Sequence, residues 1–109
     1  MIRVNIVRDK KGFIWEFTVK GHAGFGMHGE DIVCSAVSAV AYTAVGALEE
    51  LAGIKNYSEK DGYMKCNIPA DIPETEKYKV AIIMETMAIG LKQIENGYRK
   101  FVTVLDEEV

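Results

Sequence analysis

The sequence has little cysteine, little proline and no excess of one charge sign. Of its 109 residues, two are cysteine and two are proline. Two cysteines are too few for the disulfide framework of a small secreted protein, so we expect both as free thiols in a reducing cytoplasm. There is no Pro-rich or Ser-rich linker, and a chain of this length predicts a single domain over residues 1–109.

Charge and hydropathy argue against two classes of partner. Thirteen Lys and Arg against sixteen Asp and Glu give a formal net charge of −3, whereas nucleic-acid binding needs a basic face. The longest run of small apolar residues, 32–47, is interrupted by Cys34, Ser38 and Thr43. We expect this run to be too short to cross a bilayer, and no secretory signal pattern follows Met1. The sequence therefore predicts a cytoplasmic protein without direct nucleic-acid or membrane contacts.

Alternating hydrophobicity predicts five strands in two hairpins and a closing segment. Ile2–Val7 alternates apolar and polar residues, and a turn signal then leads to a second alternating run through Trp15, Phe17 and Val19. Residues 54–68 predict a second hairpin that turns at Asp61-Gly62, the dipeptide that tight hairpin turns favour. Residues 98–105 predict a last strand, followed by an acidic tail.

Two helices are predicted between these strands. Asp31 is a suitable N-cap for the first, which Gly53 ends, and Pro73 opens the second, which Gly97 ends. The expected buried positions are Val33, Val37, Val40, Ala44, Leu48 and Leu51 in the first helix and Val80, Ile83, Met84, Met87, Leu91 and Ile94 in the second, with Tyr78 also assigned to the core. The order β-β-α-β-β-α-β predicts a two-layer α+β fold, with both helices on one face of a mixed or antiparallel sheet.

A glycine-rich segment separates the first hairpin from the first helix. Within residues 21–30, four glycines alternate with two histidines, and we expect a mobile loop that contributes nothing to the core. Its glycines allow close backbone approach to a bound peptide and allow the loop to open and close. The members of this segment that we single out are Gly21, His22, Gly24, Gly26, His28 and Gly29.

The residues around this loop are suited to acyl transfer. If Asp31 is the N-cap, Cys34 lies in the first helical turn, where the unpaired N–H groups and the helix dipole favour a thiolate. His22 ends the preceding strand and is the natural base for that thiol. Asp31 either caps the helix, orients the imidazole or does both. The N–H of Cys34, with that of a loop glycine, is the candidate oxyanion donor.

Other interpretations of the same residues stay open at this point. Cys34 in an Ala-rich helix is also suited to simple packing, and His28 is a second candidate for the base. Cys66 alternates with apolar residues on a predicted strand, so we expect it in the core. His22, His28, Cys34 and Cys66 are suitable zinc ligands by type, but they lack the close spacing typical of zinc sites. We therefore expect neither a metal nor another cofactor.

The same segment is similar to one known family. Gly21-His22-Ala23, the loop glycines Gly26 and Gly29, and the run from Asp31 to Ser38 resemble the bacterial ribosomal-processing cysteine proteases of the Prp family. The resemblance extends over nearly the whole chain, in length and in the order of elements. It implies that His22 is the general base, Cys34 the nucleophile and Asp31 a supporting acidic residue.

The resemblance also implies a substrate. Prp-like proteins remove a short N-terminal extension from the twenty-seventh large-subunit ribosomal protein, cutting after hydrophobic and aromatic residues. The family is associated with homodimers and with a flexible glycine-rich loop over the site, so a homodimer is expected here. The competing hypothesis is a non-catalytic ribosome-associated or regulatory interaction module, which would use the small-residue helix for self-association and the loop to bind its partner.

Overall fold

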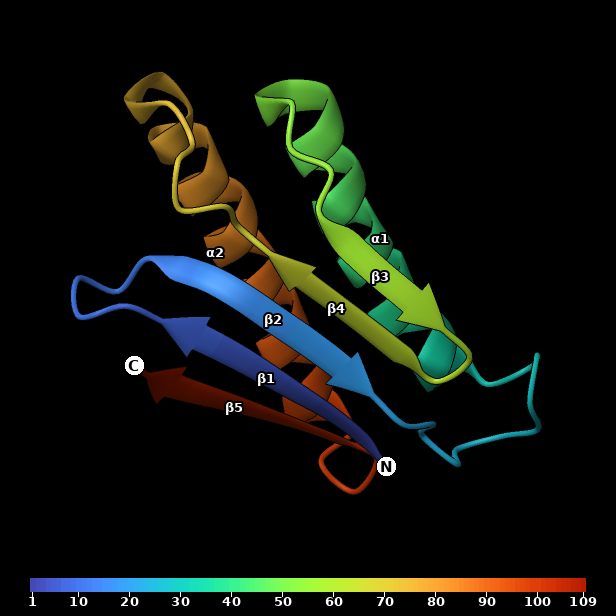
Figure 1. The fold of residues 1–109 in the computed structure, drawn as a ribbon. Coiled ribbons are helices and arrows are strands. Elements are labelled where there is room, and N and C mark those ends of the chain that lie inside the picture. The colour runs from blue at the N-terminus through green and yellow to red at the C-terminus, as the bar shows by residue number, and fades with distance from the viewer.

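The computed structural model describes all 109 residues, and its helices both lie on one face of a five-stranded sheet (Figure 1). The order of strands across the sheet is β3-β4-β2-β1-β5. The elements are β1 (Ile2–Arg8), β2 (Ile14–Lys20), α1 (Ile32–Ala52), β3 (Tyr57–Lys60), β4 (Tyr63–Asn67), α2 (Glu74–Gly97) and β5 (Val102–Glu108). The predicted order of elements and the two-layer α+β architecture are confirmed.

The sheet is mixed. β1 pairs antiparallel with β2, β2 with β4, and β4 with β3. β5 instead lies parallel to β1, because the long helix α2 carries the chain back across the sheet before β5 begins. This topology leaves β3 as an edge strand, and the β3–β4 hairpin therefore lies at the margin of the sheet, above α1 (Figure 1).

One hydrophobic core fills the space between the sheet and the helices. The buried face of α1 follows the helical repeat through Val33, Val37 and Ala41 to Ala52, which turns Leu51 outward. Leu51 was therefore assigned wrongly to the core. Tyr78 was also assigned wrongly, because it lies in an early turn of α2 with 75% of its surface exposed. The other predicted core positions are buried or packed against the core.

The last strand begins and ends later than the sequence predicts. Tyr98 does not start the strand: its N–H bonds back to the carbonyl groups of Ile94 and Glu95 and closes α2. β5 then pairs with the whole of β1, from Ile2 opposite Val102 onward, and this pairing carries the strand through most of the acidic tail. The first and last residues of β5 are therefore set by its hydrogen-bonded pairing with β1, which depends on the tertiary fold.

α1 is longer than the apolar run considered above. It has 21 residues and a mean hydropathy of 1.6 over its most apolar window, which by length and composition alone is enough to cross a membrane. A core helix has the same composition, and the inner face of α1 packs in the core. α2 approaches it closely at Gly90, where an added Cβ would lie 3.3 Å from the side chain of Val40.

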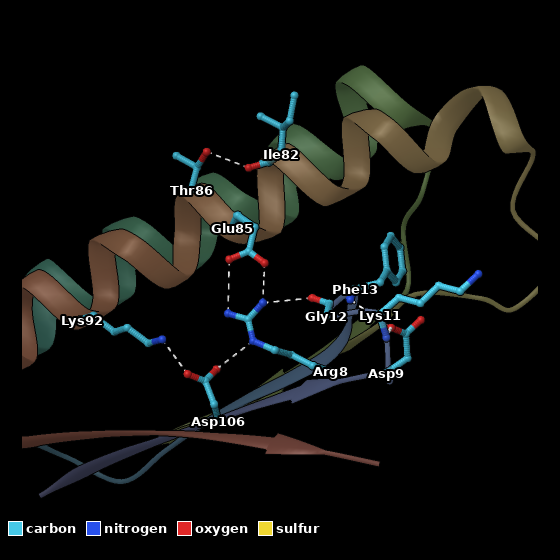
Figure 2. Close-up of polar contacts among 10 residues, drawn as sticks. All are labelled: Arg8, Asp9, Lys11, Gly12, Phe13, Ile82, Glu85, Thr86, Lys92 and Asp106. Carbon is cyan, nitrogen blue, oxygen red and sulfur yellow. Dashed lines mark hydrogen bonds and ion pairs between the residues drawn. The ribbon is translucent and has the colours of Figure 1, made fainter.

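A cluster of charged side chains ties β1, β5 and α2 together (Figure 2). The guanidinium of Arg8 pairs with Glu85 of α2 and, at 3.2 Å, with Asp106 of β5. It also donates to the carbonyl oxygen of Gly12, at 3.0 Å. Lys92 of α2 lies 2.5 Å from the other oxygen of Asp106. The side chain of Arg8 is only 20% exposed, so these contacts are partly shielded from water.

We expect Arg8→Gln to lower the free energy of unfolding by about 1 to 2 kcal/mol, because Glu85 and Asp106 would lose their shared cation. Urea denaturation monitored by circular dichroism measures the change. Arg3→Gln is the matched control, since Arg3 is an exposed residue of the same strand that makes no ion pair. Equal stability of the two variants would contradict a structural role for the cluster.

Candidate active site

A cleft of about 880 Å³ opens between the first half of α1, the β3–β4 hairpin and the glycine-rich loop. Every residue that the sequence singled out in this region lines it: Gly21, His22, Gly24, Gly26, His28, Gly29, Asp31 and Cys34. The fold therefore brings the predicted nucleophile, both candidate bases and the supporting acid to one concave surface. Cys34 and Asp31 come from the start of α1, and the histidines come from the loop after β2.

Cys34 lies in the first turn of α1 and is partly exposed to the cleft. Its Sγ accepts a hydrogen bond from the backbone N–H of Ala23, at 3.3 Å. An N–H directed at sulfur stabilises a thiolate more than a thiol, because the acceptor then carries a full charge. Ala23 itself is buried in the core, so the expectation that residues 21–30 contribute nothing to the core was wrong.

Asp31 is the N-cap of α1 and also the anchor of the loop. One carboxylate oxygen accepts the N–H groups of Val33 and Cys34, and the other accepts those of Phe25 and Gly26, all at 2.8 to 3.0 Å. Burial alone would raise the pKa of Asp31, but these four hydrogen bonds together hold it below its ordinary value. Of the two roles considered, the structure shows capping, since neither imidazole bonds to this carboxylate.

The capping geometry changes the expected oxyanion donors. The N–H of Cys34 is already donated to Asp31, and that of Ser35 is donated to the Asp31 carbonyl oxygen. In this conformation Cys34 therefore has no free N–H to offer a tetrahedral oxyanion, contrary to expectation. The carboxylate also offsets part of the positive end of the helix dipole. The Ala23 N–H is the donor that contacts the sulfur directly.

His22 faces the turn of the β3–β4 hairpin. Its Nε2 lies 3.8 Å from a carboxylate oxygen of Asp61, and its ring meets that of His28 edge to face, with 5.3 Å between centroids. No hydrogen bond joins His22 to Cys34 in this conformation, although both line the cleft. The sequence marked Asp61 only as a turn residue, and its position beside His22 depends on pairing across the sheet.

Two glycines fix the position of His22. Gly21 has φ +98°, and its N–H donates to the carbonyl oxygen of Gly62 at 2.8 Å. Gly62 has φ +69°, and a Cβ there would lie 2.9 Å from Nε2 of His22. A side chain at either glycine would be strained by the positive φ, and one at Gly62 would displace the imidazole. The hairpin turn thus forms the surface on which His22 rests.

Aromatic contacts hold the loop near its middle. The ring of Phe25 meets those of Tyr98 and Phe101 edge to face, with centroids 5.5 and 5.1 Å apart. These partners follow α2, more than seventy residues along the chain, so no local pattern could have indicated them. Phe25 thus joins the loop to the segment between α2 and β5.

The second cysteine is a packing residue, as predicted. Cys66 lies on β4 with 1% of its surface exposed, and burial raises the pKa of its thiol to about 11. No group of three or more His, Cys, Asp or Glu side chains is arranged to hold a metal ion.

Comparisons with known proteins agree on one family. A family model described as Cysteine protease Prp matches residues 1–103. Proteins named ribosomal processing cysteine protease Prp from Bacillus subtilis and Staphylococcus aureus are 34% and 30% identical to this chain. The alignments cover 91% and 92% of this chain, and 91% and 93% of those proteins, respectively.

Solved structures show the same fold. The Staphylococcus aureus Prp protease with a covalently linked product peptide aligns with a TM-score of 0.87 and 27% identity, over 98% of this chain and all of that one. A Streptococcus mutans protein, SMU.848, aligns with a TM-score of 0.82 and 34% identity, over all of this chain and 96% of that one. Another structure of the Staphylococcus aureus protease contains a substrate peptide.

We expect iodoacetamide to alkylate Cys34 and leave Cys66 unmodified while the chain is folded. Cys34 is open to the cleft, whereas Cys66 is buried and stays a neutral thiol near pH 7. Peptide mapping by mass spectrometry after a short exposure measures each site. In urea both cysteines should react, which controls for detection. Equal labelling of both thiols in the folded protein would contradict this assignment.

Proposed function

The chain belongs to the Prp family of cysteine proteases, and from this we propose that it cleaves an N-terminal extension from the twenty-seventh large-subunit ribosomal protein. In the proposed reaction Cys34 is the nucleophile and His22 is the base. The observation that carries the proposal is the shared cleft, where the partly exposed thiol and the imidazole face the same space. Two relatives are named for ribosomal processing, and one of them binds substrate and product peptides. We place the reaction in the cytoplasm, where ribosomes are assembled.

The proposed reaction has two halves. His22 takes the proton of the Cys34 thiol, and the sulfur attacks the scissile carbonyl carbon, forming a tetrahedral oxyanion. The C–N bond then breaks as His22 gives the proton to the departing amine, which leaves a thioester on Cys34. Water, deprotonated by the same imidazole, hydrolyses the thioester and restores the thiol. No other co-reactant is required.

Three features of the structure support further parts of the proposed mechanism. Nε2 of His22 faces Asp61 in the structure, so the imidazole must turn toward Sγ when a peptide enters the cleft. The Ala23 N–H, which already contacts the sulfur, would hold the thiolate before attack, and it is the backbone donor that we assign to the oxyanion after it. The loop, which Asp31 and Phe25 hold at its middle, covers the bound peptide and excludes water.

Incubation with the extended ribosomal protein should yield one truncated product, and Cys34→Ala should abolish it, because the alanine variant has no nucleophile. Intact-mass spectrometry under reducing conditions identifies the product. His22→Gln should lower kcat by about 100-fold or more, whereas His28→Gln should retain most of it.

Three results would contradict parts of this proposal. Cleavage by folded Cys34→Ala would overturn the assignment of the nucleophile. A larger loss in His28→Gln than in His22→Gln would move the base to His28. No cleavage by the folded wild-type chain would overturn the substrate and favour the non-catalytic interaction module.

We also propose that the chain forms a homodimer through the outer faces of its helices. An apolar groove of about 430 Å³ runs between α1 and α2, lined by small residues of α1 such as Ala39 and Ala47 and by Ile82 of α2. Ile82 is about half exposed, and Ile89 is more exposed still. Small side chains permit close approach of a second helix, and its apolar side chains would cover this surface.

Light scattering of the wild-type chain should then give about 24 kDa, twice the mass of one 12.1 kDa chain. Ile82→Glu should shift the mass to that of a monomer, because a buried carboxylate opposes association. Tyr78→Glu is the control, since this exposed residue of α2 does not line the groove. A monomeric wild type at micromolar concentration would overturn the dimer.

A further inference from the structure

The cleft extends well beyond the thiol, along one face of α1. Cys34, Ser38 and Tyr42 follow one another at four-residue spacing, and all three line the cleft. Eight residues of α-helix rise about 12 Å, which corresponds to three or four residues of an extended peptide. A substrate lying along this face, with its scissile bond at Cys34, would therefore place a side chain near Tyr42 three or four residues away.

A carboxylate without an ion-pair partner lies at the Tyr42 end of the cleft. Glu59 of the edge strand β3 lines the cleft and is paired in register with the buried Met64, so it lies on the helix-facing side of the sheet. Glu59 makes no ion pair in the structure. Its neighbour Lys60 also lines the cleft but does not pair with Glu59, and its Nζ lies over the Tyr63 ring, 5.7 Å from the ring centre.

Tyr42 holds this carboxylate in place. Its hydroxyl donates to one oxygen of Glu59, which leaves the other oxygen without a hydrogen-bond partner. The hydrogen bond to Glu59, partial burial and the negative charge of Glu59 all raise the pKa of Tyr42, so it stays a donor near neutral pH. The pair thus links α1 to β3 and directs one free acceptor and a full negative charge at the end of the cleft.

We propose that Glu59, positioned by Tyr42, is a specificity-determining residue that binds a Lys or Arg side chain of the substrate three or four residues from the scissile bond. This inference rests on the proposed function, because it places the scissile bond at Cys34. A substrate cation at the Tyr42 end of the cleft would form an ion pair with the Glu59 carboxylate. The aliphatic stem of that Lys or Arg side chain would lie along the helix wall that includes Ala41.

The test uses peptides spanning the cleavage site, with Lys or Gln placed in turn at each of four positions on either side of the bond. For the wild-type chain, Lys at one position three or four residues away should lower KM about fivefold relative to Gln, with kcat little changed. Glu59→Gln should abolish this preference, because it retains an acceptor for Tyr42 and removes the charge. Glu50→Gln, an exposed change of equal charge on α1 outside the cleft, should retain it.

Binding measurements separate this inference from the proposed function. Fluorescence anisotropy with Cys34→Ala should show the same Lys preference in Kd, and Cys34→Ala/Glu59→Gln should lack it. Cleavage of all peptides alike, or equal losses for Lys and Gln peptides in Glu59→Gln, would overturn the specificity role and leave the protease intact. A Lys preference in binding without cleavage by the wild type would overturn the proposed reaction and leave the subsite.

Discussion

Four backbone N–H groups converge on the carboxylate of Asp31, and the geometry of the site depends on them. Two belong to the first turn of α1, including that of Cys34, and two belong to the loop at Phe25 and Gly26. The residue is 4% exposed, and a buried carboxylate is tolerated only where hydrogen bonds replace its hydration. One side chain therefore sets where α1 begins, where the thiol lies and how the loop leaves the helix.

Local signals predicted most of the fold and the members of the site. The N-cap at Asp31, the glycine that ends α1 and the Asp61-Gly62 turn each act within a few residues, so the sequence shows them directly. The bounds of β5 could not be predicted in the same way, because they depend on pairing with β1 across the whole chain. Leu51 was misassigned for a related reason: the sheet covers a narrower arc of α1 than the apolar pattern suggests.

What the sequence could not show is how the site residues meet. The contacts of His22 with Asp61 and Gly62 join a loop to a hairpin about forty residues away, and Glu59 reaches Tyr42 from the same hairpin. Both depend on the pairing of β4 with β2, which brings the β3–β4 turn beside the end of β2. Residue types were therefore enough to indicate a Cys–His chemistry. The partners of His22 and Tyr42 could be identified only from the tertiary fold.

The separation of His22 from Cys34 follows from the same constraints. Asp31 occupies the N–H of Cys34 and offsets the helix dipole, so Ala23 supplies the direct donor to the sulfur. The imidazole meanwhile rests against a turn carboxylate and a second histidine. A chain entering between α1 and the hairpin would displace water from both groups, and the weak, exposed contact with Asp61 is easily exchanged for one with the thiol. In the reaction that we propose, substrate binding would thereby bring His22 to the thiol of Cys34, so that the thiol is activated when a peptide is present to be cut.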